Sequence, residues 1–516
     1  MKIEIKKSAL ENLSVDALVV FVAQKPESKN TSKGKGDKKE AKGGSSKAYV
    51  EGLSKALQAK IQGAIDDGTL SAGTNETVLF RDASLAGARH LLTVGLGDAS
   101  QFDHEVLRQA TASATKALAS AKVKTAAIAL DALPHNSLGG DVTVQAVAEG
   151  AIMSTYAFSD FKEKKDPGSI ERMDIVTSAK TKSYENGLEA GVAIAESVNF
   201  CRWLGDRPGN RMTPTILAEE TVKAAKGTKL KVTIWDKAKI EKEKMGSFLS
   251  VSLGSDQEPK MIVMEYNGAA SSKKPICYVG KGLTFDCGGI SIKPAAGMEE
   301  MKYDMCGGAA VISTMLAIAR LKLKVNAIAY VPSTENMPGP SANKPGDIVI
   351  ARNGKSIEVN NTDAEGRLIL CDALVYAAEQ EPALIVDAAT LTGAMVVALG
   401  NLHTGVFTRN DKLAEKIQNA ADAAGEWVWR MPLTDYHARD MKGTYADLSN
   451  ISSSKGAGSA TAAGFLEQFV PKDIPWAHFD IAGTAWNCGD RLPYHPKKGA
   501  TGAIVRTFVQ LAMDHA

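Results

Sequence analysis

The residues most able to do chemistry lie together in the chain: Asp363, Glu365 and Arg367. An apolar run, 368–378, follows them and is typical of a buried helix. We predict a strand that ends in a tight turn at Gly366, with Asp363 and Glu365 on one face of the extended chain. A helix start attracts anions, so carboxylates gathered there need a further reason to cluster, and divalent metal ions supply one. The alternative is a solvated turn with an Asp–Arg pair on the surface.

A second group of charged residues upstream favours the metal site over the solvated turn. It follows a buried-type strand at 275–279, and its last member directly precedes another apolar helix. Open α/β sheets place their ligand sites at the carboxyl ends of parallel strands, so these side chains are expected to face Asp363 and Glu365. The group consists of Lys281, Asp286, Lys293 and Asp304.

The composition is that of an ordinary globular protein without strong charge bias. The chain has 516 residues, of which 44% are apolar and 23% charged, and a formal net charge of +2. This length predicts two domains, and the charge gives no overall reason to expect nucleic acid or an anionic membrane as the main partner. No apolar run reaches the length of a membrane span, and the charged stretch 1–7 is not typical of a signal peptide. The six cysteines include no CxxC pair and predict reduced thiols in a cytoplasmic protein.

Residues 1–182 predict a smaller N-terminal α/β domain with a largely parallel sheet, because strand and helix patterns alternate along them. The helical patterns include 48–64 and 105–121. Within this domain, 24–47 is rich in Lys, Gly and Ser and predicts a mobile surface insertion. The predicted strands are 2–5, 17–22, 77–80, 90–94, 125–130 and 173–177.

Residues 183–204 predict a linker helix, and the loop of turn-forming residues after it marks the start of a larger C-terminal α/β domain, 205–516. The strands there are near-continuous apolar runs, as expected when helices cover both faces of a mixed, mostly parallel central sheet. Helical patterns at 307–321 and 367–379 separate some of them. The predicted strands are 231–235, 261–266, 276–279, 326–331, 348–351 and 384–388.

Both charged groups resemble those of the leucyl aminopeptidases, a family of two-metal cytosolic exopeptidases. The stretch Asn-Thr-Asp-Ala-Glu-Gly-Arg, 361–367, is the hallmark of that family and stands unbroken here. The resemblance covers 183–516 well, whereas the N-terminal domain agrees in layout only. It implies a macro-like N-terminal domain and a catalytic metallopeptidase domain after the linker. The other stretches that carry it are 279–293, 301–310, 387–394 and 476–483.

The resemblance implies two divalent metal ions per subunit. Asp286 and Glu365 would bridge the two ions. Lys281 and Asp304 would complete the tighter site, and Asp363 would complete the more exchangeable one. A lysine coordinates a metal only if nearby cations depress its pKa, which two metal ions would do. The ligand set suits Mn²⁺ or Zn²⁺, with Mg²⁺ or Co²⁺ as alternatives.

The resemblance also implies roles for residues around the reacting groups. Lys293 would polarise the scissile carbonyl and stabilise the oxyanion. Arg367 would hold a bicarbonate ion that acts as general base on a water bridging the two metals. The residues that would bind the substrate are Met301, Thr390, Leu391 and Gly393.

The function that the resemblance implies is that of a leucyl aminopeptidase. Such a hydrolase removes the N-terminal residue, with Leu-like side chains preferred, from peptides and amides. The expected partners are small peptide substrates and further copies of the chain in a homohexamer, with no membrane partner.

Other functions stay open from the sequence alone. Cys287 stands where a catalytic thiol could act, but no histidine lies near it in the sequence. His104 and Glu105 lack the second histidine of a zincin motif, and Asp387 and His478 are expected to be packed residues. Some bacterial relatives of the family also bind DNA, which a salt-sensitive gel shift would test. A catalytically inactive homologue is a third hypothesis, which the intact ligand set disfavours.

Overall fold

The structure, a computed structural model, describes residues 1–25, 48–50, 53–133, 138–163 and 170–516. The predicted insertion, 24–47, lies outside the described residues except for Gln24 and Lys25. The chain divides into two units. The first unit is Met1–Ala195 with Asp490–His495, and the second is Glu196–Gly489 with Pro496–Ala516.

The first unit is built on a largely parallel sheet, as predicted. Its strand order, in the part of the chain that is described, is β1-β7-β6-β2-β5-β4, with β3 beside β2. Strands β3 and β4 run antiparallel to their neighbours, and the other pairs are parallel. The strands are β1 (Lys2–Lys7), β2 (Val15–Gln24), β3 (Ala48–Tyr49), β4 (Thr77–Phe80), β5 (Ala88–Asp98), β6 (Thr125–Ala129) and β7 (Arg172–Thr177).

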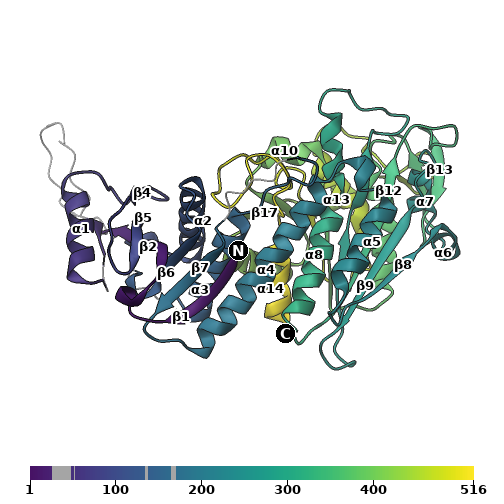
Figure 1. Cartoon of the computed structure of the whole chain (residues 1–516). Helices are drawn as coiled ribbons and strands as arrows, with labels where there is room; N and C mark the ends of the chain where they lie inside the picture. The colour runs from purple at the N-terminus through teal and green to yellow at the C-terminus, as the bar shows by residue number, and fades with distance from the viewer. Residues whose placement is uncertain (26–47, 51–52, 134–137, 164–169) are drawn as a thin grey trace, which may run out of the picture. The chain divides into compact units, whose positions relative to one another are not determined.

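Helices cover both faces of this sheet (Figure 1). Alternate residues of β2 point to opposite faces, as a strand requires. Val19 packs in the cluster that contains residues of α2 (His104–Ser120) and α3 (Gly140–Ser154). Leu18 packs in the other cluster, with residues of α1 (Lys55–Asp66). Burial on both faces explains why the strand is apolar at nearly every position.

The predicted helix at 48–64 is wrong at its start. Residues 48 and 49 form β3, which pairs with Ala23 and Gln24 at the end of β2. The backbone N–H and C=O groups of these two residues therefore find their hydrogen-bond partners in a strand and not in a helix. Ser54 then adopts an extended conformation, φ −61° and ψ 154°, so α1 begins only at Lys55.

The second unit is built on a mixed, mostly parallel sheet, which confirms the predicted fold class. Its strand order among the described residues is β17-β16-β19-β15-β10-β12-β9-β8, with β11 beside β12. The antiparallel pairs are β12 with β9, β9 with β8 and β16 with β19. The strands are β8 (Lys231–Trp235), β9 (Lys260–Asn267), β10 (Ile276–Gly280), β11 (Gly282–Asp286), β12 (Asn326–Asn336), β15 (Leu384–Ala389), β16 (Thr404–Phe407), β17 (Val428–Arg430) and β19 (Trp476–Asp480).

A separate small sheet lies in the same unit and holds the strand predicted at 348–351. Its order in the described structure is β13-β14-β18. Strand β14 runs antiparallel to β13 and parallel to β18, so it joins two segments that are far apart in the sequence. The strands are β13 (Asp347–Ile350), β14 (Ser356–Val359) and β18 (Leu448–Ser449).

The central strands of the large sheet are buried on both faces. Val279 of β10 belongs to a cluster with residues of α7 (Gly246–Ser252) and α9 (Gly366–Ala378). Tyr278 contacts the opposite helix α14 (Val505–His515), where its hydroxyl donates to the carbonyl oxygen of Phe508 at 3.2 Å. In Figure 1, α14 runs beside α8 (Cys306–Arg320), in keeping with the close contact between these two helices.

The predicted linker lies within helix α4, Lys182–Asp206, and the division between the two units falls inside this helix. The predicted domain limits at 182 and 205 stay predictions. All six cysteines lie in the described part of the chain, where each is buried and none is in a disulfide. None of the described helices has the length and apolar content of a membrane span.

Glycines bring the start of α8 against the ends of β10 and β15. A Cβ added to Gly307 would lie 2.1 Å from the carbonyl oxygen of Ala388, and one added to Gly280 would lie 2.7 Å from the carbonyl oxygen of Gly307. Both backbone groups of Lys281, which directly follows Gly280, are hydrogen-bonded to these segments. The Lys281 N–H donates to Ala388 at 2.9 Å, and the Lys281 carbonyl accepts from Gly308 at 2.6 Å. The helix start therefore fixes the backbone of Lys281.

We expect Gly307→Ala to destabilise the second unit by about 1–3 kcal/mol, because the added methyl group would collide with a backbone carbonyl. Gly63→Ala in α1 is the matched control, since nothing lies within 4 Å of its added Cβ. That control should be neutral or stabilising by up to ~1 kcal/mol. Differential scanning fluorimetry would compare the Tm of both variants with wild type. An unchanged Tm for Gly307→Ala would contradict the close packing.

Candidate metal centre

The turn that carries Asp363 and Glu365 differs from the extended chain that we predicted. Strand β14 already ends at Val359, Asp363 lies in a turn, and Glu365 has a helical conformation, φ −78° and ψ −31°. Gly366 is the first residue of α9 rather than a break after a strand. The two carboxylates therefore converge through the turn, and not through the alternation of a strand.

Thr362 fastens this turn to the segment after β11. Its hydroxyl donates to the carbonyl oxygen of Gly288 at 2.6 Å and accepts from the N–H of Ser291 at 2.8 Å. Its own N–H donates to the Ser291 hydroxyl at 3.1 Å. Within the turn, the side-chain oxygen of Asn361 accepts from the N–H of Asp363 at 2.8 Å. These bonds hold the turn opposite the end of β11.

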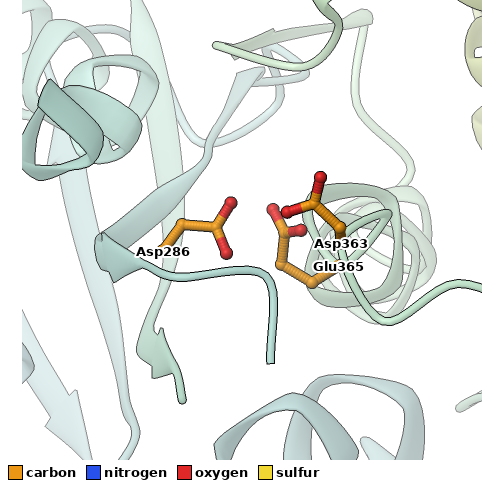
Figure 2. Close-up of side chains that lie close together, drawn as sticks. All are labelled: Asp286, Asp363 and Glu365. Atoms are coloured by element: carbon orange, nitrogen blue, oxygen red, sulfur yellow. The ribbon is translucent and has the colours of Figure 1, made fainter. Parts of the chain in front are cut away.

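Three carboxylates meet across this gap. Asp286, Asp363 and Glu365 each offer an oxygen, and these oxygens lie within 4.8 Å of one another. Figure 2 shows the Asp286 carboxylate directed from the end of β11 toward the other two, which project from the segment that opens α9. Asp286 and Glu365 are buried, whereas Asp363 is partly exposed.

Lys281 joins the fourth carboxylate to this group. Its ammonium lies 2.8 Å from Asp304 Oδ2 and 2.8 Å from Glu365 Oε1, and it donates to the carbonyl oxygen of Thr390 at 3.1 Å. The Thr390 hydroxyl donates to Asp304 Oδ1 at 2.6 Å. Burial alone would lower the pKa of Lys281, but the carboxylates of Asp304, Glu365 and Asp286 outweigh it and raise that pKa above its usual range.

Lys293 lies on the more open side of the group. Its ammonium is 2.8 Å from Asp286 Oδ2 and 2.5 Å from Asp363 Oδ1. The side chain of Lys293 is 21% exposed, compared with 3% for Lys281. Burial lowers its pKa and the carboxylates of Asp286 and Glu365 raise it by more, so the side chain is a cation at neutral pH. Lys281 and Lys293 together supply two positive charges to four carboxylates.

The remaining negative charge is what a divalent cation would fit. Burial and the neighbouring carboxylate of Asp286 raise the pKa of Glu365 to about 8. Burial likewise raises the pKa of Asp304, although the ammonium of Lys281 opposes that shift. The buried Glu365 Oε2 accepts no hydrogen bond from the described residues. Glu365 is thus a buried carboxyl group with a raised pKa and one oxygen that accepts no hydrogen bond from the described residues. Both properties are expected of a carboxyl group that serves as a metal ligand.

Arg367 lies next to the carboxylate group and keeps part of its hydrogen-bonding capacity free. It is 8% exposed, and its Nη1 donates to the carbonyl oxygen of Asn450 at 2.7 Å. Among the described contacts its buried Nε–H has no acceptor. Burial lowers its pKa to about 10, so the guanidinium is charged at neutral pH. It can therefore hold an anion.

The predicted substrate residues fall into two groups. Thr390 and Leu391 belong to the loop between β15 and α10 (Gly393–Leu399), and Thr390 touches both Asp304 and Lys281 as described above. Gly393 starts α10 and is exposed, and Met301 lies in the 3₁₀ helix Met298–Met305, which also carries Asp304. The described hydrogen bonds and ion pairs include none from Met301 or Gly393 to the carboxylates.

Two residues that the sequence analysis did not single out support the site. Asn336, at the end of β12, donates to Asp286 Oδ1 at 2.8 Å and to the Thr362 carbonyl at 3.0 Å. Asp480, at the end of β19, accepts from the Leu391 N–H at 3.2 Å and the Thr392 hydroxyl at 2.7 Å. Both are polar residues at the carboxyl end of an apolar strand, which is the signal that could have found them.

The alternative candidates are packed side chains. His478 is fully buried and its Nδ1 lies 2.6 Å from Asp387 Oδ1, while Asp387 Oδ2 accepts from the indole N–H of Trp476 at 2.7 Å. Burial raises the pKa of the Cys287 thiol, and its Sγ lies 3.1 Å from the carbonyl oxygen of Asn336. A thiol with a raised pKa carries little thiolate at neutral pH, so this geometry gives no activated nucleophile.

Residues 199–509 match the catalytic domain of the cytosol aminopeptidase family, and residues 19–165 match its N-terminal domain. The chain belongs to the cytosol aminopeptidase family. It is 58% identical over 476 residues to a probable cytosol aminopeptidase of Bdellovibrio bacteriovorus, covering 91% of this chain and 95% of that relative. This membership confirms the family predicted from the charged clusters.

Solved structures agree with this assignment. A tomato leucine aminopeptidase variant superposes with a TM-score of 0.84 at 32% identity, covering 100% of this chain and 96% of that one. The bottromycin maturation enzyme BotP in complex with Mn superposes with a TM-score of 0.82 at 28% identity, covering 97% of this chain and 100% of that one. The chain is therefore an aminopeptidase, a hydrolase, with the two-domain α/β fold of its family.

The raised pKa of Glu365 predicts that Mn²⁺ and protons compete for the site. Between its ordinary value of 4.5 and about 8, this carboxyl keeps its proton in the folded protein. A metal ion needs the carboxylate, so binding in this window should release protons and tighten as pH rises. Calorimetric titration of Mn²⁺ into chelator-stripped protein, in buffers of different ionisation enthalpy at pH 6 and pH 8, measures both effects. Proton-independent binding with equal affinity at both pH values would refute the prediction.

Proposed function

We propose that this aminopeptidase is metal-dependent and removes the N-terminal residue, with Leu-like side chains preferred, from peptides and amides. The observation that carries the proposal is the meeting of Asp286, Asp363 and Glu365 within 4.8 Å, at the ends of elements that also bring in two lysines. The carboxylates outnumber the two ammoniums and leave a net negative charge that attracts divalent cations, and the bottromycin maturation enzyme BotP, which shares this fold, forms a complex with Mn.

In this proposal Asp286 and Glu365 would be ligands shared by two ions, Lys281 and Asp304 would complete the deeper site, and Asp363 would complete the more open one. Mn²⁺ or Zn²⁺ suit these ligands best, and Mg²⁺ or Co²⁺ are alternatives. When bound, the ions would polarise the scissile carbonyl and supply a nucleophilic water at neutral pH. Lys281 must give up its proton to act as a ligand. The carboxylates of Asp304, Glu365 and Asp286 raise its pKa, and metal ions bound to these carboxylates would lower it again.

Lys293 is proposed to stabilise the charge that develops on the substrate. Its ammonium lies between Asp286 and Asp363 and is more exposed than Lys281, so it is the cation of the group that an entering substrate can reach. A fixed cation beside the carbonyl oxygen favours the tetrahedral oxyanion over the planar substrate. This preference lowers the barrier to attack.

Arg367 is proposed to hold a bicarbonate ion that takes a proton from the attacking water. The four carboxylates are committed as ligands, which leaves none of them to act as general base. The guanidinium is buried and charged, and its Nε–H has no acceptor among the described residues, so it offers an anion a charged donor close to Glu365. Bicarbonate has the oxygen atoms to accept from arginine and from water together.

The substrate would lie along the segments that carry its proposed binding residues, Met301, Thr390, Leu391 and Gly393. A free N-terminal amine can serve as a ligand, which restricts cleavage to the first residue. We further propose small peptide substrates and a homohexamer. A cytoplasmic location is proposed from the six buried free thiols and the naming of the relatives.

Metal and a free amine should both be required for activity. Chelator-stripped protein should regain hydrolysis of leucine p-nitroanilide with Mn²⁺ or Zn²⁺, and the N-acetylated anilide should stay uncleaved. Glu365→Gln should lose most metal and at least ~100-fold in kcat/KM, because it removes a bridging carboxylate. Glu265→Gln is the matched control, since this carboxylate pairs with Lys231 on the surface of the same unit. Cleavage of both anilides, or full metal content in Glu365→Gln, would overturn the proposal.

Bicarbonate should stimulate the wild-type enzyme in carbonate-depleted buffer, and Arg367→Ala should remove that response. The expected loss in kcat is ~10²–10⁴-fold, the usual contribution of a general base to the rate. Arg320→Ala, which changes a partly exposed arginine of α8, is the matched control and should respond like wild type. Rates measured across a bicarbonate titration would decide the matter. A full bicarbonate response in Arg367→Ala would place the general base elsewhere.

A further inference from the structure

Asn450 lies beside the turn that carries Asp363 and Glu365, although it is far from that turn in the sequence. It directly follows β18, which pairs with β14 in parallel register. Its N–H continues this pairing by donating to the carbonyl oxygen of Glu358 at 2.9 Å. The residue is fully buried, so its side chain must find its hydrogen-bond partners inside the protein.

The side-chain amide of Asn450 occupies the inside of the turn. Its oxygen accepts from the N–H groups of Asn360 at 2.8 Å and Asn361 at 3.2 Å. Its nitrogen donates to the carbonyl oxygen of Asn361 at 2.6 Å and approaches that of Ala364 at 3.4 Å. Ala364 stands between the two carboxylate residues, so this one amide contacts backbone on both sides of Asp363.

The backbone of Asn450 reaches the other half of the site. Its carbonyl oxygen accepts from Arg367 Nη1 at 2.7 Å, and this is the hydrogen bond that orients the guanidinium among the described contacts. A single residue therefore touches the turn that sets the carboxylates and the side chain that would hold the anion. Among the hydrogen bonds of the described residues, no other residue makes both kinds of contact.

The loop that contains Asn450 is itself fastened to β14. The Glu358 carboxylate accepts from the N–H of Ala446 at 2.9 Å and from that of Tyr445. The side chain of Asn360 donates to the Ser449 hydroxyl at 3.0 Å. These hydrogen bonds hold the segment before Asn450 in place, so the position of the Asn450 amide relative to the turn is fixed.

We propose that Asn450 is a positioning residue that sets the geometry of the carboxylate turn and of the Arg367 guanidinium together. The inference rests on the proposed two-metal function and adds a residue to it. Only an amide fits the role, because the turn presents N–H donors and carbonyl acceptors to the same side-chain end. Aspartate keeps the acceptor but loses the donor, and alanine loses both.

The test compares Asn450→Asp and Asn450→Ala with Ser356→Ala. Ser356 also links β14 to the segment at β18, since its hydroxyl donates to Asp447 Oδ2 at 2.8 Å, but it lies away from the turn. Mn²⁺ affinity of chelator-stripped protein is measured by competition with a fluorescent chelator, and Tm is recorded for each variant. Both Asn450 variants should bind Mn²⁺ ~10–100-fold more weakly than wild type, the usual effect of losing a residue that orients ligands. Ser356→Ala should bind it normally.

The aspartate variant separates geometry from charge. An added ionised carboxylate beside the site would strengthen the attraction for a cation, so weaker Mn²⁺ binding by Asn450→Asp would indicate a displaced turn and not a change in charge. For Asn450→Ala, the bicarbonate concentration that gives half-maximal stimulation should rise as well, because Arg367 loses its orienting carbonyl when the segment shifts. Neither effect is expected from a residue that only stabilises the fold.

Each remaining outcome counts against the proposal. Wild-type Mn²⁺ affinity in both Asn450 variants, with only a lower Tm, would make the residue purely structural. Failure of both variants to fold would assign Asn450 to the general stability of the unit. If the wild-type protein itself bound no Mn²⁺, the proposed function would fail first, and that result is distinct from a wild type that binds and variants that bind equally well.

Discussion

The rest of the catalytic unit depends on one constraint, the burial of four carboxylates in a small space. Charges of one sign repel there, and burial withholds the water that would screen them. When all four are ionised, two lysine ammoniums balance half of the charge, and hydrogen-bond donors stabilise the rest. Asp286 Oδ1 alone accepts from the Gly288 N–H at 2.9 Å and from the Asn336 amide at 2.8 Å. Such an arrangement persists only where rigid elements hold every member in place.

The fold meets this constraint by bringing its carboxylates from separate elements. Asp286 ends β11, Asp304 lies in the last turn of the 3₁₀ helix before α8, and Glu365 directly precedes α9. Each element is fixed by apolar packing away from the site: α9 lies in the same buried cluster as β10, and the start of α8 touches the end of β15 through Gly307. The packing of the sheet therefore determines the distances between the charged groups.

Much of this could be predicted from the sequence, because buried parallel strands and their helices have strong local patterns. The strand at 77–80 and the helices around 105–121 and 307–321 match the structure closely. The helix predicted from 48 was wrong because pairing with β2, a contact between distant residues, overrides local preference there. The turn at Asp363 was placed on an extended chain for a related reason. Its shape is set by Thr362 and Asn450, which bond to segments that no local pattern connects to it.

The burial of the site changes from one side to the other, and this gradient bears on how it would work. Lys281 and Glu365 are each 3% exposed, whereas Asp363 is 32% exposed and Lys293 is 21% exposed. A cation held by the deep pair would have to break contacts shielded from water before leaving, and one held by Asp363 would face solvent directly. Under the proposed function, a peptide would bring its N-terminal amine and first carbonyl beside Lys293 from this open side. One asymmetry in burial would thus account, in the proposed function, for an ion that is harder to exchange and for a defined direction of substrate entry.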